Sequence, residues 1–186
     1  MKKCRQCKVM FEPTMSSLQI CCTPDCAFKW AKTIKGSEYV AKAKRAETRQ
    51  QKQALKTKPE WTKEAQKAFN AYIRQRDWNQ PCISCDTPAN NRANYWDSGH
   101  YKSVGSALEL RFEPSNAHKQ CKHCNRDLSG NIVEFRIRLI KRIGQKMVDW
   151  LEGPHEIPKV TIDVLAEIKS RFKKMEKELR DGRKYH

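Results

Sequence analysis

The sequence has no long hydrophobic run and few acidic side chains. None of its 186 residues belongs to an apolar stretch near the ~18 that a membrane-spanning helix needs, so no membrane partner is expected. The N-terminal MKKCRQC is basic but is not followed by an apolar segment, which argues against a secretory signal. We therefore expect the chain to stay in the cytoplasm, where thiols are reduced.

The shortage of acidic residues leaves a strongly basic chain. Asp and Glu number 21 against 38 Lys and Arg, for a net charge of +17. Residues 1–58 hold 14 of the basic and 4 of the acidic side chains, a net charge of +10. Such a balance favours a polyanionic partner, most commonly nucleic acid. The alternative is a solvated basic surface that only keeps the chain soluble.

Nine cysteines are present, and clustered cysteines in a reducing compartment usually bind metal. Pairs spaced C-x2-C can aim two sulfurs at one tetrahedral ion. The spacing predicts two four-thiolate zinc sites, formed by Cys4, Cys7, Cys22 and Cys26 and by Cys82, Cys85, Cys121 and Cys124. Cys21 is left over, and Cys22 is preferred as the ligand because its gap to Cys26 suits a short knuckle. Reduced structural thiols and an iron–sulfur cluster are the alternatives.

The residue pattern predicts a helix-rich α+β fold in four regions. Residues 1–35 form a zinc knuckle, 36–58 a basic helical arm, 59–153 a central domain, and 154–186 a C-terminal helix. Helices are expected over 36–58, 60–77, 128–151 and 161–181, and a hairpin over 100–112, broken at 104–106. Residues 36–58 show little apolar periodicity, so that helix is expected to be a solvated connector or an arm along a phosphate backbone.

Three elements of the central region occur in a suggestive order. Asp97-Ser98-Gly99-His100 follows the second cysteine pair, Asn116 lies in the next loop, and Asn125 directly follows the third pair. This order resembles the zinc-stabilised HNH, or His-Me finger, nucleases. The resemblance implies a ββα unit within 59–153 that holds one divalent metal, Mg²⁺ or Mn²⁺. A histidine in that unit activates water, and the zinc has only a structural role.

The segments GHY, LRFEPSNAHKQCKHCN and LSGN are similar to the signature of the NinG/Rap recombination proteins of lambdoid phages. The similarity covers the whole chain, including the N-terminal knuckle and the Lys/Gln-rich segment. It implies a structure-selective endonuclease acting on branched DNA, including Holliday junctions and D-loops, in phage recombination. The compartment implied is then the cytoplasm of the host bacterium.

The resemblance also implies residue roles. His100 is the general base, Asn116 braces the loop that orients it, and Asn125 is a metal ligand. Many HNH enzymes carry an aspartate directly before the general base, where this chain has Gly99, so Asp97 is the candidate second ligand. His118 competes as a ligand of metal or phosphate. The alternatives are a solvated or satisfied histidine and an ordinary turn asparagine, and His123 is expected to face solvent.

Phosphate contacts are expected from two helices, through Lys42, Lys44, Arg45, Arg49 and Lys52 and through Arg136, Arg138, Lys141 and Arg142. Simple solvation of these side chains is the alternative. Symmetric cutting of a four-way junction needs two active sites, so a homodimer is expected, with the apolar stripe of 161–179 available for contact. The competing function is a non-catalytic zinc-containing DNA-binding accessory or regulator of recombination.

Overall fold

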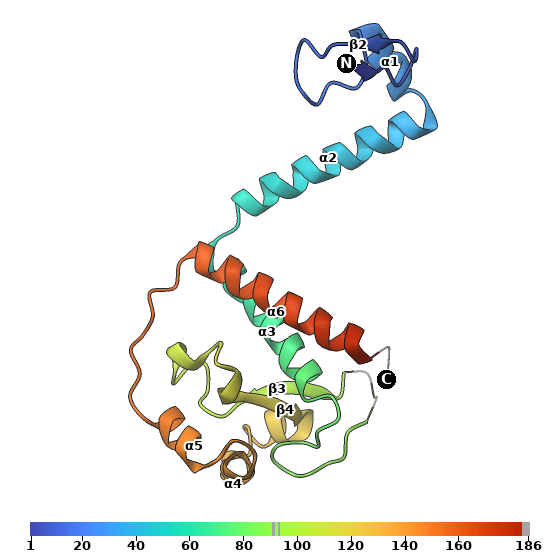
Figure 1. Cartoon of the computed structure of the whole chain (residues 1–186). Helices are drawn as coiled ribbons and strands as arrows, with labels where there is room; N and C mark the ends of the chain where they lie inside the picture. The colour runs from blue at the N-terminus through green and yellow to red at the C-terminus, as the bar shows by residue number, and fades with distance from the viewer. Residues whose placement is uncertain (91, 93, 184–186) are drawn as a thin grey trace. The chain divides into compact units, whose positions relative to one another are not determined.

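The computed structural model describes residues 1–90, 92 and 94–183, and it divides into two compact units, Met1–Lys56 and Thr57–His186 (Figure 1). The helix-rich α+β class expected from the sequence is confirmed. The regions expected at 59–153 and 154–186 both lie in the second unit, and residues 184–186 are outside the described part. No helix in the described residues is both long and apolar enough to cross a membrane.

The first unit begins with a small hairpin. Strand β1 (Lys2–Lys3) pairs antiparallel with β2 (Met10–Phe11), and helix α1 (Pro24–Ala31) follows. The Thr23 hydroxyl caps α1 by accepting a hydrogen bond from the Cys26 amide at 3.2 Å. The Trp30 side chain packs on Cys4 and Cys21, so one aromatic ring and the cysteines make the core of this unit.

Helix α2 (Ile34–Ala54) has one buried residue, Gly36, and most of its other side chains are exposed, including those of Ile34, Tyr39 and Val40. A Cβ at Gly36 would overlap the Trp30 carbonyl, so the close approach of α1 to the start of α2 requires glycine there. The helix ends four residues before the expected position 58, because the next helix already starts at Lys58.

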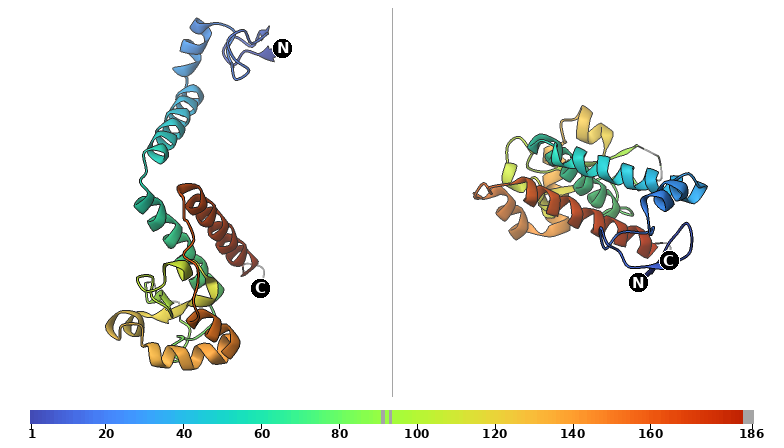
Figure 2. Two further views of the ribbon diagram at one scale, coloured as in Figure 1. Left: turned by 90° about the vertical axis from the view of Figure 1, so that its left-hand side faces the viewer. Right: turned by 90° about the horizontal axis from the view of Figure 1, so that it is seen from above.

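The second unit is built on two long helices that lie side by side in Figures 1 and 2. Helix α3 (Lys58–Arg76) starts with a capping box in which Thr57 and Glu60 satisfy each other's backbone amides. Its face of Phe69, Tyr72 and Ile73 packs against Phe172 of α6 (Ile162–Gly182). The middle of the apolar stripe of 161–179 is therefore covered within the chain, whereas Ile162 and Leu179 near its ends are exposed.

A two-stranded antiparallel sheet carries the candidate site. Strand β3 (Trp96–His100) pairs with β4 (Ala117–Cys121), with His100 opposite Ala117. The hairpin expected within 100–112 is wrong, because the strands lie at either end of a long connection instead. That connection holds two 3₁₀ turns, η1 (Leu108–Leu110) and η2 (Pro114–Asn116), and sends Leu110 into the core.

The single helix expected over 128–151 is broken in the structure. Helix α4 (Ile132–Ile143) ends at Gly144, whose φ of 84° continues no right-handed helix, and α5 (Gln145–Glu152) begins after it. Residues of α4, α5 and the 101–116 connection form one core cluster. The sheet thus lies between the α3–α6 pair and α4–α5, with Ala117 packed beside Phe69 and His118 against Phe135.

Candidate active site and cysteine clusters

The cysteines form the two groups of four that the spacing predicts. The sulfur atoms lie within 4.8 Å of one another in each group, namely Cys4, Cys7, Cys22, Cys26 and Cys82, Cys85, Cys121, Cys124. Four converging thiolates are the ligand set of a structural zinc site. The choice of Cys22 over Cys21 is confirmed, because Cys21 is buried beside Trp30 and outside the group.

The leading C-x2-C pair of each group lies in a turn, and the two turns have the same backbone hydrogen bonds. In the first, the Cys4 amide donates to the Val9 carbonyl at 2.8 Å and the Lys8 amide to the Cys4 carbonyl at 3.0 Å. In the second, the Cys82 amide donates to Thr87 at 2.9 Å and the Asp86 amide to Cys82 at 3.2 Å. Lys8 and Asp86 both adopt positive φ, 66° and 55°. In both groups, therefore, a residue in the left-handed conformation closes the turn that carries the first two cysteines.

His100 ends strand β3, half-buried beside the ring of Phe69. Its Nε2 lies 3.1 Å from the Arg111 carbonyl oxygen. A carbonyl only accepts, so Nε2 carries the proton and Nδ1 keeps a lone pair. Burial lowers the pKa of His100 below its ordinary value of 6.5, despite hydrogen bonds to the Arg111 and Ser98 backbone that raise it. The imidazole is therefore neutral at pH 7.

Asn116 is fully buried and holds the connection between the strands. Its Oδ1 accepts from the Lys102 amide at 2.8 Å, and its Nδ2 donates to the carbonyls of Lys102 at 3.0 Å and Leu110 at 3.1 Å. The Tyr101 amide also donates to the Asn116 carbonyl at 2.8 Å. One side chain thus ties down both ends of the loop that carries Arg111, the partner of His100.

Asn125 lies in a π-helical turn, η3 (His123–Asp127), a feature frequent at functional sites. It lines a cavity of about 580 Å³ together with His100, Ser98 and Lys102. Its Nδ2 also donates to Asp97 Oδ2 at 3.1 Å. Asn125 is therefore beside both His100 and Asp97.

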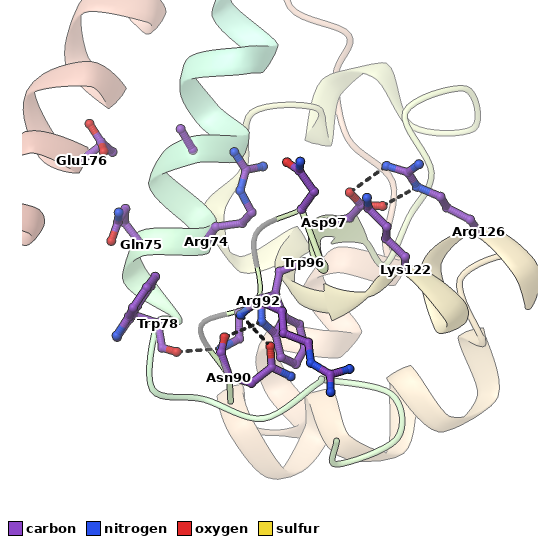
Figure 3. A pocket seen from close by; sticks show the side chains of 13 residues that line it. Arg74, Gln75, Trp78, Asn90, Arg92, Trp96, Asp97, Lys122, Arg126 and Glu176 are labelled. Carbon is purple, nitrogen blue, oxygen red and sulfur yellow. Dashed lines mark hydrogen bonds and ion pairs between the residues drawn. The ribbon is translucent and has the colours of Figure 1, made fainter. Parts of the chain in front are cut away.

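Asp97 faces a different cavity from His100. Arg126 grips its carboxylate with two hydrogen bonds of 2.7 and 3.0 Å (Figure 3). Burial would raise the pKa of Asp97, but the hydrogen bonds from Arg126 and Asn125 outweigh it and lower the pKa. The carboxylate is ionised, adjacent to Asn125, and already neutralised by a guanidinium.

His118 is a buried histidine with both ring nitrogens satisfied. Arg76 Nη2 donates to its Nδ1 at 3.1 Å, and its Nε2 donates to the Ser115 carbonyl at 3.2 Å. Burial lowers its pKa, so the ring stays neutral and Arg76, not His118, balances the charge of Asp77. His118 is therefore part of the buried sheet, with no free lone pair for a metal and no free N–H for a phosphate. His123 is exposed, beside Asp127.

The expected phosphate contacts differ in their surroundings. Lys42, Lys44, Arg45, Arg49 and Lys52 are all exposed on α2. On α4, Arg136 pairs with Glu152 at 2.7 Å, and Arg138 pairs with Asp86 and Glu134. Arg142 is half-buried and Lys141 is exposed. The free charges on α2 and at Lys141 are therefore the better placed to meet phosphate.

Several functional neighbours had no signal in the sequence. Arg76 donates to Asp77, His118 and the carbonyls of Pro114 and Ala117, which joins the end of α3 to strand β4. Arg111 supplies the carbonyl beside His100, and Arg126 the guanidinium on Asp97. Apart from the contact between the adjacent Arg76 and Asp77, these contacts join residues 11 to 42 positions apart, and no local spacing marks them.

The family model described as Bacteriophage Lambda NinG protein matches residues 1–182. The chain belongs to the NinG family. It is 39% identical over 196 residues to "Protein ninG" of Escherichia phage 933W, covering 98% of this chain and 95% of that one. It is 38% identical over 198 residues to "Protein ninG" of Escherichia phage lambda and of Salmonella phage P22, with the same coverage. The NinG resemblance predicted from the sequence is confirmed. No solved structure matches.

Proposed function

We propose that this NinG-family protein is a structure-selective DNA endonuclease that cuts branched recombination intermediates such as Holliday junctions and D-loops. One observation carries the proposal. A neutral imidazole with its Nε2 proton fixed on a backbone carbonyl lines the same cavity as Asn125, in a turn that directly follows a four-cysteine cluster. The order β3, β4, η3 and α4 around it supports the ββα unit that the HNH resemblance implies.

His100 supplies the proton transfer. Phosphodiester hydrolysis needs a water deprotonated as it attacks phosphorus, and the base must be neutral beforehand. The Arg111 carbonyl holds the Nε2 proton, so Nδ1 takes the proton from water. The imidazolium formed stays hydrogen-bonded to that carbonyl. Asn116 keeps Arg111 in place by fixing the loop at Lys102 and Leu110.

The side chains of Asp97 and Asn125 fit a divalent cation by donor type. Mg²⁺ and Mn²⁺ prefer oxygen ligands and are often held by one or two carboxylates plus substrate phosphate. Asn125 offers an amide oxygen. Asp97 offers a carboxylate that Arg126 holds in this structure and whose Oδ2 lies 3.1 Å from the Asn125 Nδ2. A cation bound by these two residues would neutralise charge on the scissile phosphate and the leaving 3′ oxygen. Once the cation occupies the Asp97 carboxylate, Arg126 is free to bind a phosphate.

Branched DNA is the partner that the charge supports best. Exposed Lys and Arg side chains are spread along α2, which suits phosphate contact rather than reading of base edges. Cutting two strands of a junction symmetrically calls for two copies of the site, so we propose a homodimer on DNA. On α6, α3 covers the middle of the apolar stripe, and Ile162 and Leu179 near its ends are exposed.

The second candidate is a zinc-containing DNA-binding accessory without catalysis. Two observations favour it over an enzyme: Gly99 occupies the position of the usual HNH aspartate, and Arg126 neutralises the one carboxylate next to Asn125. In this alternative, the fold, the two cysteine groups and the net positive charge serve only to bind DNA.

Cleavage of a labelled four-way junction in Mg²⁺ or Mn²⁺ decides between the two. We expect His100→Ala to lose roughly 10²–10⁴-fold in cleavage rate with unchanged junction affinity, because one neutral imidazole adds little to binding. His123→Ala is the matched control, since that exposed histidine lies by the same cluster and should cut normally. Asn125→Ala should partly recover at high Mg²⁺ or Mn²⁺, and His100→Ala should not. Wild-type cutting by His100→Ala would favour the accessory.

A further inference from the structure

A second cavity lies next to the sheet, on the side where Asp97 and Arg126 meet (Figure 3). Its volume is about 510 Å³, within the usual size of a small-ligand site. Five basic side chains line it against two acidic ones, Asp97 and Glu176. We call it the basic pocket. Its five basic lining residues are Arg74, Arg92, Lys119, Lys122 and Arg126.

Three of these cations are not held by a described hydrogen-bond partner, although the carboxylates of Asp97 and Glu176 attract Arg74 at longer range. Arg126 is held by Asp97, and the Lys119 Nζ donates to the Trp78 carbonyl at 2.7 Å. The side chains of Arg74, Arg92 and Lys122 make no hydrogen bond or ion pair with any described residue. Arg74 is half-buried in this state, so its guanidinium is costly to leave without an anion. The pocket is therefore prepared for negative charge.

Aromatic and amide groups line the same pocket. Trp78 is 42% exposed, and Trp96 is oriented by a hydrogen bond of 3.0 Å from its Nε1 to the Asn90 carbonyl. Lys119 joins the two, because its Nζ contacts the Trp78 carbonyl and lies 4.4 Å from the Trp96 ring centroid. The Gln75 Oε1 is buried without a described hydrogen-bond partner. Rings and free amide oxygens beside cations suit a nucleobase as well as a phosphate.

We propose that the basic pocket binds an unpaired nucleotide of a DNA strand, with its phosphates on Arg74, Arg92 and Lys122 and its base against the tryptophans. The proposal rests on the DNA substrate proposed above and adds how a branch is recognised. Duplex arms keep their bases stacked, whereas the branch point of a D-loop exposes unpaired nucleotides. A pocket of this size beside the cleavage site would select such points without reading sequence.

The test is affinity of the full chain for a fluorescein-labelled dT12 oligonucleotide, without added divalent cation. Arg74→Gln and Lys122→Gln should each weaken binding roughly tenfold, and Lys146→Gln, an exposed charge on α5, should change it less than twofold. Trp78→Ala should weaken dT12 binding roughly tenfold but leave a 12-mer of abasic sites, equal in charge, unaffected. Cysteine-bound zinc content and thermal melting of each variant verify its fold.

The outcomes separate the two proposals. Equal binding of dT12 and the abasic 12-mer by the wild-type chain would show a phosphate patch only and overturn the nucleotide pocket. So would pocket variants that bind dT12 like Lys146→Gln. Loss of dT12 binding in the variants, with no junction cleavage by the wild-type chain, would keep the pocket and reject the endonuclease. A 5-iododeoxyuridine cross-link that maps to Trp78 or Trp96 would support the pocket directly.

Discussion

Gly99 separates this chain from the many HNH enzymes with an aspartate directly before the general base. A Cβ at Gly99 would overlap the side-chain amide of Gln120 on the neighbouring strand. Gln120 cannot easily move away, because its Nε2 donates to Ser84 Oγ and to the Gly130 carbonyl, both at 2.6 Å. The missing carboxylate is thus a packing requirement of this sheet.

Gly99→Ala should therefore destabilise the fold by about 1–3 kcal/mol through overpacking, as measured by urea unfolding. Gly105→Ala is the control, because a Cβ there meets nothing within 4 Å. Adding Gln120→Ala should cost less in the Gly99→Ala background than alone, a coupling that a double-mutant cycle detects. Additive losses would mean that the two side-chain positions do not compete for space.

The pH dependence of cleavage follows from His100. The base acts only when neutral, and burial lowers its pKa below the ordinary 6.5. If the chain cuts DNA as proposed, we expect single-turnover cleavage to fall in acidic solution with its midpoint below pH 6.5, as His100 becomes protonated. A fall with its midpoint above pH 6.5 would contradict a buried base. Junction binding measured over the same range controls for changes in DNA affinity.

The residue patterns predicted the candidate metal-binding and catalytic residues better than the residues that hydrogen-bond to them. Both cysteine groups were predictable, because thiolate spacing alone limits which sulfurs can converge. His100, Asn116 and Asn125 were found through a family motif, and the structure brings them around one loop and one cavity. The hydrogen bonds from Arg76 to Asp77 and His118 were not predictable, because they depend on how the end of α3 packs against β4.

At the scale of elements, helices with an apolar face were predictable and the sheet was not. Periodicity located α3 and α6 within about two residues of their ends. It could not show the break at Gly144, because the apolar repeat continues across it into α5. The sequence of 100–112 resembled a hairpin broken at 104–106, but the segment belongs to the connection between the strands. Its real conformation is set by Asn116, a contact across 14 positions.

Helix α2 offers a prediction of its own. If its exposed cations grip phosphates, changing Lys42, Lys44 and Arg45 to Gln should flatten the salt dependence of duplex binding. The slope of log affinity against log salt should fall by roughly 0.9 for each lost contact. Changing Lys146, Lys173 and Lys177, exposed on α5 and α6, removes equal charge as the control. An equal slope in both triple variants would make α2 a solvated connector.

For the whole molecule, the sharpest prediction is metal content. Protein purified without added metal should contain about two zinc ions per chain, one for each group of four thiolates. Cys22→Ser should reduce this to about one, and Cys21→Ser should leave two, since Cys21 lies outside the group. Elemental analysis distinguishes these results. Iron, or one zinc in the wild-type chain, would refute the pairing.

The second cysteine group has a topological consequence. It joins residues 82–85 to 121–124, so His100 and Asn116 both lie inside the ring that it closes. A metal there acts as a cross-link, and closing a ring of this length removes chain entropy worth about 4 kcal/mol on the disulfide model. If the chain cuts DNA as proposed, a strong chelator should therefore abolish cleavage slowly, at the rate at which the ring opens, and adding Mg²⁺ afterwards should restore nothing until zinc returns.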